Sequence, residues 1–243
     1  MSAANQTAKI KPVRRTRVSD EVVVQLTHLI LDGQFTPDQK LPAERELARQ
    51  LGINRTSLRE ALRRLETMGL LRIRPGDGVF VRDTNTAAGL EFVKFLLENG
   101  IGLDTQLILN LAESRRIVGA EMIRLAAARI TPEQLAALET IVADYPRDDP
   151  AARAEADFAF FHQVAQATGN LVFVYLLNTL RDVVEKMSGV YMQAVGDPAN
   201  AVKLYAGLIE AFGRRDGKKA ARLFDRRAAA DDRKLFSQFG DIS

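Results

Sequence analysis

The feature that most restricts how this chain can fold is a helix with an arginine stripe, predicted to begin just after Asn54, a good N-cap residue. Apolar side chains then recur at i, i+3, i+4 and i+7, so they share one face of the helix. They are Leu58, Ala61, Leu62 and Leu65. A second face carries Arg55, Arg59 and Arg63. One face can therefore pack into a core while the other presents a row of cations.

The neighbouring segments predict a small set of elements around this helix. An earlier helix is expected over 19–32, with Ser19 as its N-cap and Gly33 as its left-handed stop. A short helix is expected over 43–51 and ends at Gly52. Residues 70–74 and 79–82 alternate between apolar and polar side chains on either side of a loop of proline and glycine, which predicts a two-stranded hairpin.

These elements follow one another in the order of a winged helix-turn-helix. The major groove of B-DNA admits one α-helix, and arginines on that helix can contact phosphates or guanine edges. The residues in the first two turns of the third helix are therefore expected to face DNA. They are Arg55, Thr56, Ser57 and Arg59. The alternative is a small helical interaction domain whose arginines form an ordinary solvated face.

The charge distribution favours the DNA-binding interpretation. The chain has 243 residues and a formal net charge of +3. Residues 1–82 hold 15 Lys and Arg against 9 Asp and Glu, whereas residues 83–243 hold 19 against 22. The basic excess therefore belongs to the first third of the chain, as expected for an anion-binding head on a near-neutral body.

Residues 41–81, LPAERELARQLGINRTSLREALRRLETMGLLRIRPGDGVFV, resemble the DNA-binding domain of the GntR family of bacterial transcription regulators. The resemblance implies that the hairpin is a wing that reaches the minor groove, and that a homodimer reads a short palindromic operator in double-stranded DNA. It also implies that Arg45 and Gly76 face the operator, together with the four residues of the third helix named above.

Beyond residue 83 the sequence predicts helices, so the fold class is mainly α. We expect a disordered arm over 1–18, a DNA-binding domain over 19–82, a linker over 83–88, and an antiparallel all-α bundle of about seven helices over 89–243. The clearest start signal is Thr131 followed by Pro132 and Gln134, which predicts a capping box. The helices are predicted near 88–99, 104–129, 132–145, 151–168, 171–194, 198–213 and 216–238.

Within this helical part, ADFAFFHQVAQATGN at 156–170 resembles the effector-binding domain of the FadR subgroup of that family. Most members hold a divalent metal with one Asp and three His, and the Asp lies one helical turn before the first His. Here His162 matches the first His, but Phe158 stands four residues before it. Asp157 lies five residues back, about 140° round the helix rather than about 40°. The resemblance puts Tyr205 and Arg227 at the later ligand positions, and a guanidinium cannot coordinate a metal. We therefore expect no metal cofactor.

The spacing of Asp157 and His162 instead resembles the fatty-acid regulators of the subgroup, which lack the metal and release DNA on binding long-chain acyl-CoA. That resemblance implies an effector site, for which acyl-CoA is the expected ligand and a small organic or sugar acid is the alternative. Its expected lining residues are Arg115, Asp157, His162, Tyr191, Tyr205, Arg227 and Phe236. Each has a structural alternative, because buried tyrosines and phenylalanines usually pack as core.

Two other classes of function are the alternatives to a ligand-responsive regulator. An enzyme is not expected, because we find no Ser-His-Asp set and no phosphate-cradling glycine loop, and the chain has only two histidines. A thioesterase acting on acyl-CoA is the version of that alternative to test. A nonspecific architectural DNA binder is the other alternative. The absence of cysteine excludes disulfides and thiolate metal sites, and a basic start without an apolar stretch makes us expect a cytoplasmic protein without a membrane partner.

Overall fold

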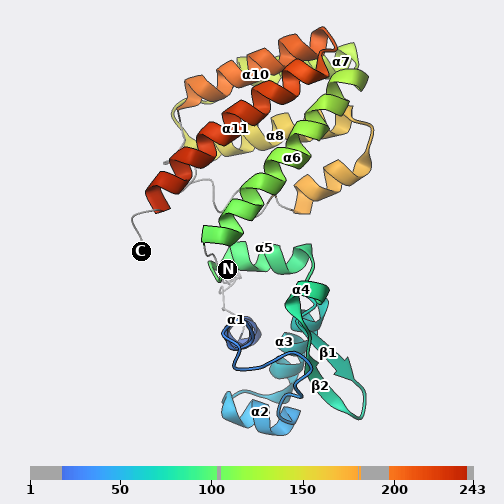
Figure 1. Cartoon of the computed structure of the whole chain (residues 1–243), viewed down its shortest axis with the longest axis vertical. Coiled ribbons are helices and arrows are strands. Elements are labelled where there is room, and N and C mark those ends of the chain that lie inside the picture. Colours follow the sequence, from blue (N-terminus) through green and yellow to red (C-terminus); the bar gives the residue numbers. More distant parts are fainter. Residues whose placement is uncertain (1–17, 103–104, 180, 182–196, 240–243) are drawn as a thin grey trace, which may run out of the picture. The chain divides into compact units, whose positions relative to one another are not determined.

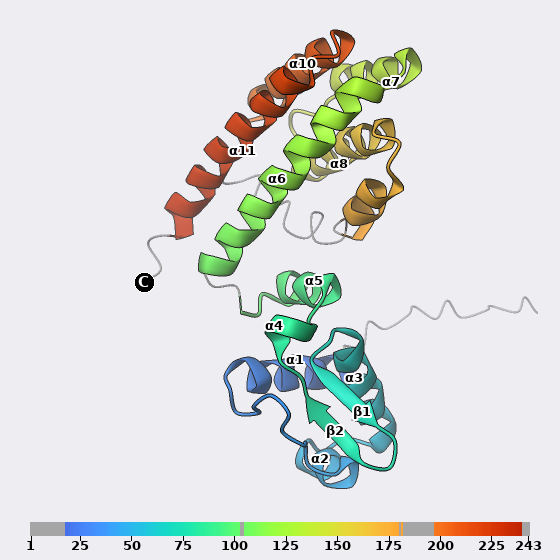
Figure 2. The ribbon, with the colours of Figure 1, turned by 45° about the vertical axis from the view of Figure 1, so that its right-hand side comes forward.

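The computed structural model describes residues 18–102, 105–179, 181 and 197–239 (Figure 1). The chain divides into two compact units that part between Val93 and Lys94. The first unit carries the only sheet in the described part of the chain, and helices make up the second (Figure 2). The mainly helical fold class predicted from the sequence is confirmed. The predicted arm over 1–18 falls almost wholly outside the described residues.

The first unit has the predicted order of elements. They are α1 (Val18–Leu31), α2 (Glu44–Gln50), α3 (Arg55–Thr67), β1 (Leu71–Arg74), β2 (Gly78–Val81) and α4 (Thr84–Ala87). The side chain of Asn54 accepts a hydrogen bond from the Ser57 backbone N–H at 2.8 Å, so the predicted cap of α3 is confirmed. The predicted cap at Ser19 is wrong, because α1 begins one residue earlier and Ser19 is a buried helical residue. Residues 84–87, inside the segment expected to be a linker, form the helical turn α4, which Asp83 caps.

The hairpin gains a third, partial strand that the sequence did not predict. β1 and β2 pair antiparallel, with Leu71 opposite Val81. The loop before α2 then runs along β2, where the backbone N–H of Leu41 donates to the carbonyl of Val79 at 2.8 Å. Lys40 forms an isolated bridge with Phe80 in the same segment. This pairing brings residues that precede α2 beside the predicted wing.

A leucine-rich core holds these elements together. The predicted apolar face of α3 is buried, and α1 supplies Val23 and Leu26 against it. Burying such a side chain stabilises the fold by about 1.5–3 kcal/mol. The fully buried large side chains of this unit are Val23, Leu26, Leu58, Leu62, Leu65, Leu70 and Leu71. The opposite face of α3 therefore stays at the surface.

After β2 the described elements are all helical and follow the predicted spacing. They are α5 (Leu90–Asn99), α6 (Thr105–Arg129), α7 (Pro132–Ala143), α8 (Pro150–Ala167), α10 (Pro198–Gly213) and α11 (Gly217–Phe239). Residues 171–179 are also helical, and most of the rest of the helix predicted over 171–194 lies outside the described residues. The predicted capping box is confirmed, since the side chains of Thr131 and Gln134 each accept the other's backbone N–H.

Two long helices form the frame of the second unit. α6 and α11 run side by side in opposite directions (Figures 1 and 2). Helices α7, α8 and α10 pack with them around one apolar core. The largest side chains that are fully buried there are Ile123, Leu138, Phe160, Leu208 and Phe212. No helix among the described residues is both long and apolar enough to cross a membrane.

Candidate nucleic-acid interface and effector site

The surface of α3 presents the side chains that the sequence predicted for DNA contact. Arg55, Thr56 and Arg59 are exposed in its first two turns, and Ser57 is half-buried. Asn54 caps the same end, so the helix N-terminus carries backbone N–H groups and cations together. Helix N-termini and arginines both attract phosphate oxygens.

One of these arginines is already held by another helix. The Nε of Arg59 donates to Oε2 of Glu44 in α2 at 2.7 Å. Arg59 keeps 61% of its side-chain surface exposed, while Glu44 keeps 29%. The ion pair therefore fixes the stem of Arg59 without covering its outer end.

The other two predicted arginines have no such anchor. Arg45 lies exposed on α2 and Arg55 lies exposed on α3. Neither forms an ion pair with any residue that the structure describes. Such arginines can bind a polyanion directly, because no internal ion pair has to be broken first.

The hairpin end carries a second group of cations. Gly76 lies exposed at the turn with a φ of +79°, a left-handed conformation that glycine adopts without strain. Nζ of Lys40 lies 3.2 Å from Oδ1 of Asp77, and the guanidinium of Arg74 lies over the Phe80 ring, 4.6 Å from its centroid. Lys40 was not predicted from the sequence, because it reaches this group only through its pairing with β2.

The structure thus brings together the DNA-facing residues predicted on α2 and α3, which pack against each other. It also adds Glu44 and Lys40 to that part of the surface. The contact of these residues with DNA stays a prediction.

In the helical unit, the half-buried carboxylate of Asp157 joins three helical segments. Oδ1 of Asp157 accepts hydrogen bonds from the hydroxyls of Tyr145 at 2.7 Å and Tyr205 at 2.5 Å. The Tyr205 ring stacks on Phe160, with 4.1 Å between the centroids. Tyr145 follows α7, Asp157 lies on α8 and Tyr205 lies on α10, so this cluster ties the bundle together inside its core.

Burial controls the acidity of this cluster. It raises the pKa of Asp157, although the two tyrosine hydroxyls and nearby Arg153 act to lower it. Burial also raises the pKa of Tyr145, and the neighbouring Asp157 carboxylate adds to that rise. Tyr145 therefore stays protonated and keeps donating to Asp157.

The residues present do not fit the metal site that the FadR resemblance implies. Asp157 already accepts two tyrosine hydroxyls. His162 lies against the Phe158 ring, with 5.7 Å between the centroids. Of the two later ligand positions, one is Tyr205 and the other is Arg227, whose guanidinium repels a cation. No group of three or more His, Cys, Asp or Glu side chains able to hold a metal occurs in the part of the chain that the structure describes.

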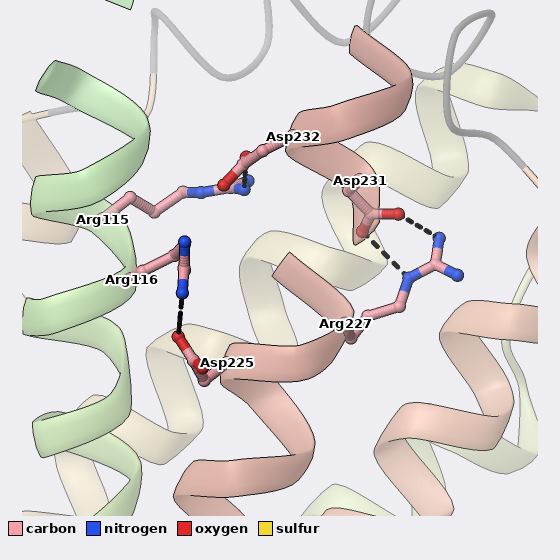
Figure 3. A network of polar contacts seen from close by, with 6 residues as sticks. All are labelled: Arg115, Arg116, Asp225, Arg227, Asp231 and Asp232. Carbon is pink, nitrogen blue, oxygen red and sulfur yellow. Dashed lines mark hydrogen bonds and ion pairs between the residues drawn. The ribbon is translucent and has the colours of Figure 1, made fainter. Parts of the chain in front are cut away.

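The predicted cationic effector residues are engaged with aspartates of α11 (Figure 3). Arg115 donates to Asp232 at 2.5 Å, so it joins α6 to α11. Arg227 pairs through Nε and Nη2 with both oxygens of Asp231, at 2.9 and 2.5 Å. Arg116, next to Arg115, pairs with Asp225 at 2.8 Å. An anionic ligand in this region would have to compete with these carboxylates.

Two predicted effector residues cannot be placed. Tyr191 lies outside the described residues. Phe236 falls within the bounds of α11, but its side chain also lies outside what the structure describes. The roles of Tyr145 and Asp232 were not predicted from the sequence. The one indication in the sequence was that each is a polar residue at a position where the helical pattern does not predict exposure.

Both units match known families. Residues 18–81 match the family described as bacterial regulatory proteins, gntR family, and residues 110–229 match the FCD domain. An HTH-type transcriptional regulator of Mycobacterium tuberculosis is 40% identical over 170 residues, which cover 68% of each chain.

Two further relatives carry names that state a regulated process. The fatty acid metabolism regulator protein of Edwardsiella ictaluri is 34% identical over 187 residues, covering 76% of this chain and 77% of the relative. An Escherichia coli protein named for regulation of the L-lactate dehydrogenase operon is 32% identical over 169 residues, covering 70% of this chain and 66% of the relative.

Proposed function

The chain belongs to the GntR family of bacterial regulatory proteins, and from this premise we propose that it is a homodimer whose affinity for a palindromic operator is controlled by a small ligand. As a family member with an FCD domain, it is a DNA-binding transcription regulator. We assign the DNA-binding domain to 19–82, the linker to 83–88, and the effector and dimerisation domain to 89–243. Its place of action would be the cytoplasm, where the bacterial chromosome lies.

The observation that carries the operator proposal is the exposed N-terminal part of α3. Arg55 and Arg59 stand one helical turn apart on the face opposite the core. A helix of this kind reads base edges in the major groove, while cations beside it hold the phosphates. A single unit of this size contacts only a half-site, so a two-fold dimer on a palindrome supplies the second set of contacts.

For the ligand, we favour a long-chain acyl-CoA. The relative from E. ictaluri is named for fatty acid metabolism. Asp157 accepts hydrogen bonds from two tyrosine hydroxyls, and Arg227 stands at one of the metal-ligand positions. This chain therefore lacks the donors of the usual metal site, at which a small acid could bind. The arginines of α6 and α11 could exchange an aspartate for a CoA phosphate, because guanidinium pairs well with either anion.

The alternative ligand is a small organic or sugar acid. The relative named for the L-lactate dehydrogenase operon favours it. A small carboxylate would need only one of the arginine pairs, for example that of Arg115 with Asp232. Either ligand can alter DNA binding only by the difference in its affinity for the two conformations of the dimer.

An operator is first selected by the protein from a random duplex library. Titration of each candidate ligand into the complex of the protein with this selected operator then separates the two ligands. Oleoyl-CoA at micromolar concentration should weaken the complex or change its footprint, while lactate and gluconate should leave it unchanged. Mass spectrometry should recover the oleoyl-CoA intact, whereas sustained hydrolysis would indicate a thioesterase. A response to the small acids alone would replace acyl-CoA by the alternative.

A further inference from the structure

One face of α11 carries a row of exposed cations, which we call the α11 ridge. Its members are Lys218, Arg222, Arg226 and Arg233. At 3.6 residues per turn the four positions lie within about 80° of one another around the helix. At 1.5 Å per residue they extend along about 22 Å of its length. The ridge therefore presents a line of positive charge on the surface of the helical unit.

The cations of the ridge differ from other exposed cations of the helical unit in their pairing. Elsewhere on this surface arginines pair with glutamates of their own helix or the same helix end. These pairs are Arg124 with Glu121 and Arg214 with Glu210. No member of the ridge forms an ion pair with any residue that the structure describes. Their charges are therefore not neutralised within that part of the chain.

The aspartates of α11 do not neutralise the ridge, because arginines already hold them (Figure 3). Asp225 lies beside the ridge on the helix, but it pairs with Arg116 of α6 at 2.8 Å. The other two pairs are Asp231 with Arg227 and Asp232 with Arg115. The carboxylates of this helix thus stabilise the bundle, and the outer cations are left for another anion.

This arrangement opposes the stability of the helix itself. Lys218, Arg222 and Arg226 are spaced four residues apart, and like charges at i and i+4 destabilise a helix. Lys218 also lies in the first turn of α11, where the helix dipole disfavours a cation. Local patterns that work against the fold are expected mainly at functional sites. An anion bound along the ridge would remove this repulsion.

We infer that the α11 ridge is a docking surface for an acidic segment of a partner protein. Guanidinium groups bind carboxylates through charge-assisted hydrogen bonds, and complementary charge directs the approach and register of the two partners. Cations four residues apart on a helix repeat every 6 Å or so. Alternate side chains of an extended peptide repeat about every 6.6 Å. An extended segment with a carboxylate at every second residue therefore matches the ridge.

Duplex DNA is the other polyanion to consider, and the charge around the ridge does not favour it. Even with the ridge included, residues 83–243 hold 19 Lys and Arg against 22 Asp and Glu. A duplex carries a charge about every 1.7 Å along its axis, so its field acts on these acids as well as on the ridge. A short acidic segment can contact the ridge alone. The inference concerns a surface of the helical unit and does not depend on the proposed operator binding.

The experiment uses the full-length protein and a defined acidic probe. The probe is a 12-residue peptide of alternating Glu and Thr that carries a fluorophore at one end and a photo-crosslinking residue at its centre. Fluorescence anisotropy measures its affinity, and mass spectrometry locates the crosslinks. Both are recorded with and without an excess of random duplex, which occupies the basic first unit. Crosslinks should fall within α11 under both conditions, and a peptide of alternating Gln and Thr should not bind.

Two double variants with equal loss of charge test whether the ridge is responsible. Arg222→Gln with Arg226→Gln removes two ridge cations, and Arg124→Gln with Arg214→Gln removes two exposed arginines that are already paired. In excess random duplex, the ridge variant should lose about fivefold or more of its affinity for the acidic peptide, while the control variant should lose little. The melting temperature of the ridge variant should equal or exceed that of the wild type, because a repulsion is removed.

Crosslinks confined to the first unit, or equal affinities of the two double variants for the peptide, would overturn the inference. Displacement of the peptide from α11 by random duplex would also overturn it and would assign the ridge to nucleic acid. A larger assembly of the wild type than of the ridge variant in sedimentation would assign the ridge to a second copy of the chain instead. A lower melting temperature of the ridge variant than of the control would show that the two arginines serve the fold, and would contradict the inference as well.

Discussion

The hydroxyl of Tyr205 donates a hydrogen bond of 2.5 Å to Oδ1 of Asp157, which links α10 to α8 in the core of the helical unit. Tyr145 donates to the same oxygen from the end of α7. A single acceptor therefore satisfies two buried donors that come from different parts of the chain. In the metal-binding members of the subgroup a cation is expected to link such helices; here hydrogen bonds do so.

Replacement of this acceptor should destabilise the bundle. Asp157→Ala leaves two hydroxyls without an acceptor, and each unsatisfied buried donor costs about 1–3 kcal/mol. Asp157→Asn keeps an oxygen at the same place and should lose much less. Urea unfolding of the two variants tests this prediction. Equal stability of Asp157→Ala and the wild type would show that the cluster contributes nothing.

The same carboxylate should give the stability a characteristic pH dependence. Burial raises the pKa of Asp157 in the folded state, so folding favours its protonated form. The stabilising contribution is fully present below the ordinary aspartate pKa of about 4 and is lost as the pH rises through the raised value. Relative to Asp157→Asn, the wild type should therefore become less stable as the pH increases. Urea unfolding of both proteins at several pH values measures this difference, and a constant difference would contradict the assignment.

Gly69, between α3 and β1, should be the least replaceable glycine of the first unit. Its φ is +86°, and an added Cβ would lie 2.0 Å from the carbonyl oxygen of Ala87, which is backbone and cannot move aside cheaply. Gly69→Ala should cost about 3 kcal/mol of stability. Gly76→Ala is the matched control, because it has a similar φ of +79° but nothing within 4 Å, and it should cost about 1 kcal/mol. Thermal unfolding ranks the two, and an equal loss would contradict the predicted clash.

Loss of an exposed arginine on α3 should weaken operator binding without affecting the fold. Arg55→Ala should reduce the free energy of binding by roughly 1–3 kcal/mol and lower the salt dependence. Arg222→Ala, which removes an exposed arginine from α11, should leave operator binding unchanged. Gel-shift titrations over a range of salt concentrations compare them, with size-exclusion chromatography to check that assembly is unaltered. Wild-type affinity of Arg55→Ala would remove this residue from the interface.

Chelators should have no effect on this protein. Asp157 is committed to two tyrosines and Arg227 to Asp231, so the donor set of a metal centre is missing. Dialysis against EDTA should change neither the melting temperature nor the affinity for the operator. A fall in either one that added zinc reverses would establish a metal site after all.

Local patterns in the sequence predicted the parts of the fold that depend on neighbours in the chain. The cap at Asn54, the buried face of α3 and the capping box at Thr131 all follow from spacings of three or four residues. Such spacings fix which side chains share a face or a turn, whatever the rest of the chain does. The hairpin was predictable for the same reason, because its loop has the required residues.

Contacts between distant elements were not predictable in this way. Glu44 and Arg59 meet only because α2 packs on α3, and Tyr205 lies 48 residues from the Asp157 that it contacts. Arg115 was expected to serve an anionic ligand, and the structure pairs it with Asp232, 117 residues away. Periodicity identifies the face on which a residue lies, but only the packing of the helices determines its partner.

The central claim is that the stripe on α3 reads a sequence. Competition between the selected operator and random duplex, at one salt concentration and with the effector absent, tests it most directly. Specific operators exceed random DNA in affinity by roughly 10³-fold or more, and we expect a ratio of that size. A ratio near one, at which phosphate contacts would account for all binding, would contradict the account.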